Sequence, residues 1–163
     1  MTAPATIVEA IAANLMADVT VGNGAPVALG HAYTGRRKSY DWQSGPFAVV
    51  ILGDHGIDET RYTEGGGGKR RIKYHSAIDL AWVNPDVDDA SVDTVKPEED
   101  FLTLIEAVKA SLRKHTSLGG LVLKCAEDDI TVEPVLFVPQ NIPHRETSMR
   151  FDVLDQITAA ATG

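Results

Sequence analysis

The residues with the most chemical potential in the sequence are Asp54, His55 and Asp58, in the stretch GDHGIDE. They follow an apolar, β-branched run, so we expect them at the end of a buried strand, where they can supply a general base or metal ligands. One hypothesis is therefore a small metal-assisted hydrolase that uses these three residues. Histidine beside aspartate is also common in glycine-bounded turns for reasons of turn geometry alone.

Two other stretches resemble ligand-binding loops without completing them. GGGGKRR, residues 65–71, has no serine or threonine after Lys69, and a strand pattern follows where a phosphate loop needs a helix. DVDDASVD has Asp86 and Asp88 at calcium-loop spacing, but Ala90 stands where a third oxygen ligand belongs. We therefore expect a glycine hairpin tip and a solvated acidic loop.

No GxSxG, HExxH or CxxC spacing occurs in the chain. The single cysteine, Cys125, lies in an apolar strand pattern and is interpreted as a small core residue, which fits a reducing compartment or a particle assembled inside one. The sequence thus predicts a protein that is not an enzyme, with no catalytic residues, no cofactor and no metal.

Charge is segregated along the chain, with a basic stretch around the four glycines and an acidic stretch from Asn84 to Asp100. The residues assigned to a subunit or tube interface are Arg61, Lys69, Arg70, Arg71, Lys73, Asp86, Asp88 and Asp89. One interpretation is two solvated loops. The other is that the basic hairpin of one subunit meets the acidic loop of its neighbour in a head-to-tail contact that forms a ring.

The totals indicate one ordinary domain, residues 1–163, of which 44% are hydrophobic. The formal charge of -8 argues against a general nucleic-acid binder, because affinity for phosphates comes mainly from clustered lysine and arginine. No run approaches 18 apolar residues and the N-terminus lacks a secretory pattern, so we expect neither a membrane span nor export.

The element that must position these residues is the segment from Lys69 to Val83. Its apolar residues fall on one parity and its polar residues mostly on the other, which predicts a long strand with one buried face. Ile57 to Val83 is expected to form a long β-hairpin, whose mobile tip is residues 64–69. Asn84-Pro85 ends the strand and opens the acidic loop, residues 84–96.

Two amphipathic helices are expected. The first runs from Pro4 to Asp18, with Thr2 or Thr6 as a candidate cap. The second begins at Pro97, because proline fits the first helical turn and carboxylates there complement the helix dipole. Its apolar stripe consists of Phe101, Leu104, Ile105, Val108 and Leu112.

Further strands complete a layered fold. FAVVILGD, after Pro46, suits a strand buried on both faces. Residues 121–126 and 130–138 are expected to form a hairpin, 144–153 the last strand, and 33–45 a flexible loop with an aromatic anchor. The predicted fold class is α+β, with a mainly antiparallel sheet, two helices packed on one face and a long protruding β-hairpin.

Taken in this order, the chain resembles the tail-terminator, or tail-completion, proteins of long-tailed bacteriophages. The matching features are the opening helix, PFAVVILG, the arm-like pair with RRIKYHSAIDLAWV, the helix FLTLIEAVKASLRKH, and the closing strands LVLKCAEDDITVEPV and TSMRFDVL. The resemblance is one of layout over most of the chain. The segment from Tyr33 to Gly45 is longer than that layout requires.

The resemblance implies a structural virion protein: a subunit of a ring, usually of six subunits, that caps the tail tube, stops its polymerisation and joins it to the head-side connector. Its implied partners are copies of itself, the tail tube protein and the connector protein, with DNA passing through the lumen without specific binding. The implied location is the head-proximal end of the tail, and the host cytoplasm during assembly. Another head-tail joining or tail tube protein is the alternative within the same class.

Overall fold

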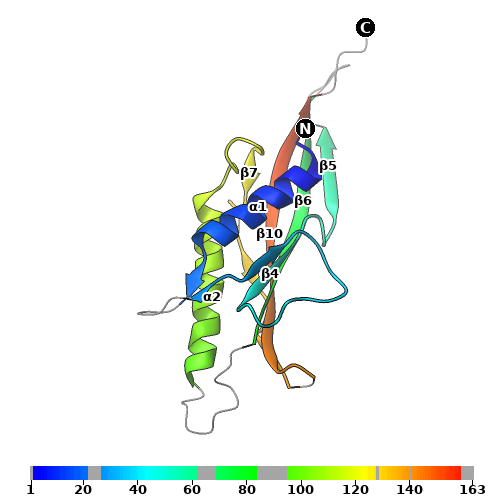
Figure 1. Ribbon diagram of the computed structural model, residues 1–163. Coiled ribbons are helices and arrows are strands. Elements are labelled where there is room, and N and C mark those ends of the chain that lie inside the picture. The colour runs from blue at the N-terminus through cyan, green and yellow to red at the C-terminus, as the bar shows by residue number, and fades with distance from the viewer. Residues whose placement is uncertain are drawn as a thin grey trace.

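A long antiparallel strand pair, β6 and β10, forms the centre of the sheet (Figure 1). The computed structural model describes residues 2–21, 27–61, 69–83, 95–127, 129–139 and 141–158. The elements are α1 (Pro4–Asp18), β1 (Thr20–Val21), β2 (Val27–Ala28), β3 (His31–Tyr33), β4 (Phe47–Ile51), β5 (Ile57–Arg61), β6 (Lys69–Trp82), α2 (Val95–Lys114), β7 (Lys124–Cys125), β8 (Thr131–Val132), β9 (Leu136–Val138) and β10 (His144–Thr158). Most of the predicted hairpin tip and acidic loop lies outside the described residues.

The register of β6 against β10 is unbroken from Lys69 opposite Thr158 to Trp82 opposite Arg145. Alternation of side chains places one face of both strands in the core. The β6 residues on this face that are almost fully buried include Ile72, Tyr74, Ile78, Leu80 and Trp82, and those of β10 are Met149, Phe151 and Val153. The long half-buried strand predicted from the period of two is confirmed.

The flanking strands attach to the two outer edges of this pair. β4 pairs antiparallel with residues 77–81 of β6, and β5 pairs antiparallel with residues 70–74. β3 adds to β4 in parallel, whereas β7, β8 and β9 all run antiparallel to β10. In the described chain the sheet is therefore mixed but mostly antiparallel, and both helices lie on one face of it, as the α+β prediction requires (Figure 1).

The hairpin predicted for residues 121–138 is wrong. β7 and β8 do not pair with each other; they follow one another along the same edge of β10, with Cys125 opposite Val153 and Val132 opposite Met149. β10 pairs with β8 at residues 149 and 150 and with β7 at residues 153 and 154, and it continues to Thr158, beyond the predicted end at Val153.

The core lies between the helices and the buried face of the sheet. The residues of α1 that the spacing assigned to the core are all buried: Ile7, Val8, Ile11, Ala12 and Leu15. The same holds for the predicted stripe of α2, since Phe101, Leu104, Ile105, Val108 and Leu112 are all 4% exposed or less. Both stripes join one hydrophobic cluster with the inner face of β6 and β10.

The C-terminal ends of the two helices are joined through Asp18. Its carboxylate accepts hydrogen bonds from Ser111 at 2.9 Å, Lys114 at 3.2 Å and His115 at 2.7 Å. Partial desolvation opposes its ionisation, but the bonds from His115, Ser111 and Lys114 outweigh that effect and lower the pKa of Asp18. These three hydrogen bonds thus offset the unfavourable interaction of a carboxylate with a helix C-terminus.

The predicted side-chain cap of α1 is wrong. Ala3 occupies the N-cap position and makes no side-chain cap bond. Thr2 instead donates its backbone N–H to the buried carboxylate of Asp155 at 2.9 Å, and its hydroxyl to the carbonyl of Leu121. The start of the chain is therefore attached to the sheet. The N–H of Thr2 also gives the buried carboxylate of Asp155 a hydrogen-bond partner, which a buried charge requires.

Leu104 and Leu102 provide a matched test of the core. Leu104 is fully buried and Leu102 is 55% exposed on the same helix. We expect Leu104→Ala to lower the free energy of unfolding by about 2 to 5 kcal/mol, through lost burial and a residual cavity. Leu102→Ala should change it by no more than about 0.5 kcal/mol. Urea denaturation followed by circular dichroism measures both, and equal losses would contradict the placement of α2.

Candidate functional site

The basic residues predicted for an interface gather at one end of the sheet. Arg61 lies opposite Arg70 in the register of β5 and β6, and Thr60 lies opposite Arg71. Arg61, Lys69, Arg70 and Arg71 are exposed, and Lys73 is half-buried. We call these five residues the basic end. Glu59 offsets part of their charge through an ion pair with Arg70 at 2.8 Å.

The acidic half of the predicted interface is only partly described. Asp86, Asp88 and Asp89 lie outside the described residues. Three acidic residues of the same stretch, Glu98, Glu99 and Asp100, stand at the start of α2, and the first two are exposed. α2 begins at the end of the molecule where β6 finishes, opposite the end that carries β5 (Figure 1). We call these three residues the acidic end.

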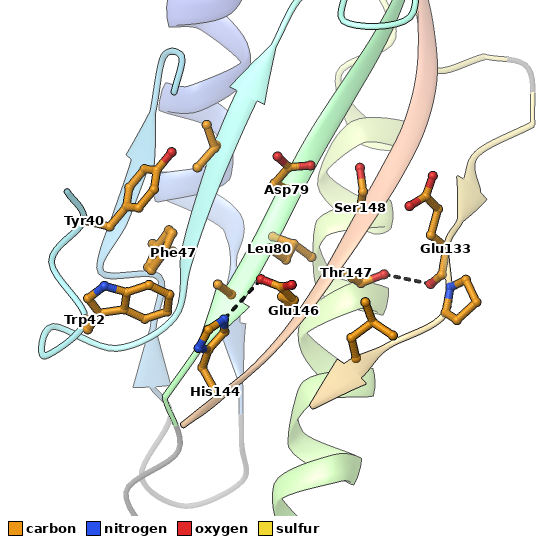
Figure 2. A pocket seen from close by; sticks show the side chains of 14 residues that line it. Tyr40, Trp42, Phe47, Asp79, Leu80, Glu133, His144, Glu146, Thr147 and Ser148 are labelled. Carbon is orange, nitrogen blue, oxygen red and sulfur yellow. Dashed lines mark hydrogen bonds and ion pairs between the residues drawn. The ribbon is translucent and has the colours of Figure 1, made fainter. Parts of the chain in front are cut away.

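A groove on the sheet face turned away from the helices lies toward the same end of β6 as the start of α2 (Figure 2). Its volume is about 420 Å³. β6 and β10 form the floor, the segment 40–49 forms one wall, and residues 133–136 form the other. We call it the outer groove, and its lining residues are Tyr40, Trp42, Phe47, Val49, Asp79, Leu80, Ala81, Glu133, Pro134, Leu136, His144, Glu146, Thr147 and Ser148.

The aromatic wall of the outer groove is built by the loop 33–45, which supplies the predicted aromatic anchor. The ring of Tyr40 stacks on Phe47 with centroids 4.9 Å apart, and Trp42 meets Phe47 edge-on at 5.0 Å. Trp42 also contacts the imidazole of His144 at 4.5 Å. Such aromatic pairs add stabilisation beyond their buried area, so this loop packs as a second small cluster on the outer face of β4.

Asp41 fixes the turn that carries these rings. Its carboxylate accepts bonds from the Ser44 hydroxyl, from His31 and from the backbone N–H of Gln43. These bonds, the one from Ser44 first, lower the pKa of Asp41 to about 2. The turn is therefore held by a carboxylate that stays ionised at all ordinary pH values.

Three acidic residues, Asp79, Glu133 and Glu146, line the outer groove. The carboxylate of Glu146 lies 3.1 Å from Nε2 of His144, and Glu133 forms an ion pair with Arg150 at 2.8 Å. The hydroxyl of Thr147 donates to the carbonyl of Glu133 at 2.7 Å and so joins the floor to the β8–β9 wall. Sequence reasoning placed Asp79 on the outward parity of β6 but did not connect it with Glu133 and Glu146.

Asp54, His55 and Asp58, the residues of the hydrolase hypothesis, are held by different partners. Asp54 accepts two bonds from the guanidinium of Arg36, at 2.9 and 3.2 Å, which lower its pKa. His55 lies 3.6 Å from Asp54, whereas Asp58 binds His75. Over the described parts of the chain, no group of three histidine, cysteine, aspartate or glutamate side chains is placed to hold a metal ion.

His75 joins three strands on the outer face. Its Nε2 lies 2.7 Å from Asp58 on β5, and its Nδ1 lies 2.8 Å from Asp152 on β10. Because an ionised carboxylate can only accept, both ring nitrogens can donate at once only when the imidazole is protonated. The bonds to Asp58 and then to Asp152 raise the pKa of His75 above 6.5. A hollow of about 350 Å³ beside it is also lined by His55 and Arg150.

No protein-family model matches this chain, and no curated protein matches its sequence. Neither described helix is both long and apolar enough to cross a membrane. The site itself is therefore the basis for inferring the function.

The His75 bridge predicts a pH dependence of stability. The pKa of His75 is higher in the folded state than in the unfolded state, so protonation of His75 stabilises the fold. This stabilisation is fully present below about pH 6.5 and is lost as the pH rises through the folded pKa. We expect His75→Gln to destabilise the protein more at pH 6 than at pH 9, and Asp152→Asn to act in the same direction. Urea midpoints at the two pH values measure this, and a His75→Gln effect independent of pH would contradict the bridge.

Cys125 should be inert in the native protein. It is fully buried, and desolvation raises its pKa to about 12, so almost no thiolate forms near neutral pH. We expect no reaction with a thiol-specific chromogenic reagent at pH 8, and one equivalent of reaction per chain in denaturing urea. Rapid labelling without denaturant would contradict this burial.

Proposed function

We propose that this protein is a structural assembly protein, a tail-terminator ring subunit of a long-tailed bacteriophage. In this role it caps the tail tube, stops its polymerisation and joins it to the head-side connector. The observation that carries the proposal is the placement of opposite charges at the two ends of one subunit. Five basic residues surround the start of β6, and the acidic residues at the start of α2 lie at the other end (Figure 1).

The length of β6 keeps these charges apart within a subunit. From Lys69 to Trp82 the strand rises by roughly 43 Å at about 3.3 Å per residue. At this separation, several Debye lengths at physiological salt, the two ends barely attract each other. Between two subunits they can meet directly, and the contact is then head-to-tail. A repeated head-to-tail contact either closes a ring or grows a filament.

Exposed apolar surface near the groove supports a protein partner there. Val135, Leu136 and Phe137 are consecutive, and Leu136 and Phe137 are 57% and 48% exposed. Ile142, shortly before β10, is also exposed. Neighbouring apolar residues left open to solvent commonly mark an interaction surface. Apolar contact would supply affinity, and the charges would supply orientation.

The resemblance in layout supplies the rest of the proposal. It gives a ring of six subunits at the head-proximal end of the tail, with the tail tube protein and the connector protein as partners, assembled in the host cytoplasm. The net charge of -8 suits a lumen through which DNA passes without binding. We assign no catalysis and no cofactor to this role. Another head-tail joining or tail tube protein is the nearest alternative.

The metal-assisted hydrolase is the alternative of another class. Asp54 and Asp58 are engaged by Arg36 and by His75 respectively, so the three residues of the hypothesis do not share one centre. The hollow beside His55 is the feature that a hydrolase would use. Metal analysis of the purified protein, together with loss of any hydrolytic activity in His55→Ala, would favour the enzyme over the assembly protein.

Reversing the charge of the basic end should weaken assembly. We expect the double variant Arg70→Glu, Arg71→Glu to lower the self-association constant at least tenfold, because each reversal converts an attraction into a repulsion at the contact. Light scattering and electron microscopy of the purified protein measure the size and shape of the assemblies. The wild type should form closed rings, alone or on tail tubes.

The matched control places the same charge change elsewhere. Lys38 and Arg113 are exposed on the loop 33–45 and on α2, and neither belongs to the basic end. Lys38→Glu with Arg113→Glu should leave assembly unchanged, and circular dichroism should show that both double variants remain folded. Equal weakening by the two variants would indicate a general effect of net charge and would remove the head-to-tail contact.

A further inference from the structure

The outer groove has the chemistry of a receptor for cationic side chains. Asp79, Glu133 and Glu146 line it, and none of its described lining residues is a lysine or an arginine. The side chains of these three acids are 38%, 42% and 45% exposed, so each can be reached from outside. The groove therefore presents a concentrated negative charge in a concave surface, where a cation is partly shielded from water.

The carboxylates keep capacity for a further donor. Glu133 contacts Arg150, Glu146 contacts His144, and Arg36 approaches Asp79 only to 3.9 Å. An ionised carboxylate has two oxygens and about four acceptor positions, so one contact does not saturate it. Each of these carboxylates therefore keeps free acceptor positions, and a guanidinium that enters the groove can form bidentate hydrogen bonds with them.

The aromatic wall favours arginine in particular. Figure 2 shows the rings of Tyr40, Trp42 and Phe47 on one side of the floor and Glu133 on the other. A planar guanidinium can stack on an aromatic face while its N–H groups bond a carboxylate, which an ammonium group does less well. The volume of about 420 Å³ is in the range of ordinary ligand sites, about 300 to 1,000 Å³.

We propose that the outer groove receives the basic end of the β5–β6 hairpin of a second copy of this chain. This inference rests on the proposed function. Of the two acidic surfaces at that end of the subunit, the start of α2 and the outer groove, it assigns the outer groove as the partner of the basic end. Within residues 57–61 and 69–73, five basic and two acidic residues leave three excess positive charges. The groove carries three carboxylates, so the two surfaces are opposite in sign.

The occupant cannot be the hairpin of the same subunit. Asp79 and Ala81, on the groove floor, lie ten and twelve residues along the continuous strand from Lys69, or roughly 33 to 40 Å. β5 pairs with residues 70–74 and so stays at the far end of β6. A contact between the two surfaces therefore joins different copies, uses a different patch on each, and is head-to-tail.

Disulfide trapping tests the contact directly. Thr60 is exposed on β5 beside the arginines, and Leu136 lies at the rim of the groove. We expect Thr60→Cys with Leu136→Cys on one chain to give a ladder of cross-linked multimers after mild oxidation with diamide. Cys125 is buried and should not compete. The matched control, Thr60→Cys with Met16→Cys at an exposed position of α1, should give no ladder.

Charge exchange gives a second measurement that does not depend on cysteine. Glu146→Arg should weaken self-association at least tenfold, and the exposed control Glu9→Arg should not. Combining Glu146→Arg with Arg70→Glu, Arg71→Glu on one chain should restore at least part of the lost association, because the pairing is then inverted. A combined variant weaker than either parent would overturn the proposal.

The outcomes separate this inference from the proposed function. Closed rings without a ladder from Thr60→Cys, Leu136→Cys would overturn the groove contact and leave the ring. A ladder with open filaments would leave the groove contact and overturn the terminator ring. A monomer at all concentrations without a ladder would overturn both. Rings that persist in Glu146→Arg but no longer bind tail tubes would assign the groove to the tube protein, against this proposal.

Discussion

The uninterrupted pairing of β6 with β10 is the constraint on which the rest of the structure depends. Because side chains alternate across a strand, one register decides both faces over the whole length. The inner face carries the apolar residues that bury α1 and α2. The outer face carries Asp79, His75 and Asp152, which lie among polar partners. A slip of one residue would exchange the faces, so the packing of the core also fixes the placement of the outer groove.

The length of β6 also separates the basic end from the acidic residues at the other end of the subunit. Arg61 faces Arg70 across β5 and β6, Arg71 and Lys69 lie beside them, and Glu59 forms an ion pair with Arg70. Like charges held side by side destabilise an isolated sheet. A sequence that keeps such an arrangement at an exposed edge is consistent with a partner of opposite charge. The acidic residues at the other end, and those of the outer groove, have the sign that such a partner requires.

Much of the fold follows from local pattern, and the outer groove does not. α1, α2 and β6 have periodicities strong enough to predict their type and their buried residues, and the continuous apolar run of β4 predicts a strand buried on both faces. β7 and β8 are too short to carry a period, and their pairing depends on the length of β10, so they were mistaken for a hairpin. The basic end is contiguous in sequence and could be predicted. The groove joins Tyr40, Asp79, Glu133 and Glu146 from four segments, and only the sheet register brings them together.

The attachment of β5 determines how well the basic end can act as a docking element. All residues of β5 are exposed, so no apolar burial holds this strand, and among the described strands its backbone pairs only with β6. The bridge from Asp58 through His75 to Asp152 adds a side-chain connection to the centre of the sheet. A surface that is ordered before contact loses less conformational entropy on binding. Protonation of His75 strengthens this bridge, so the bridge stabilises β5, the strand that carries Arg61, more at low pH than at high pH.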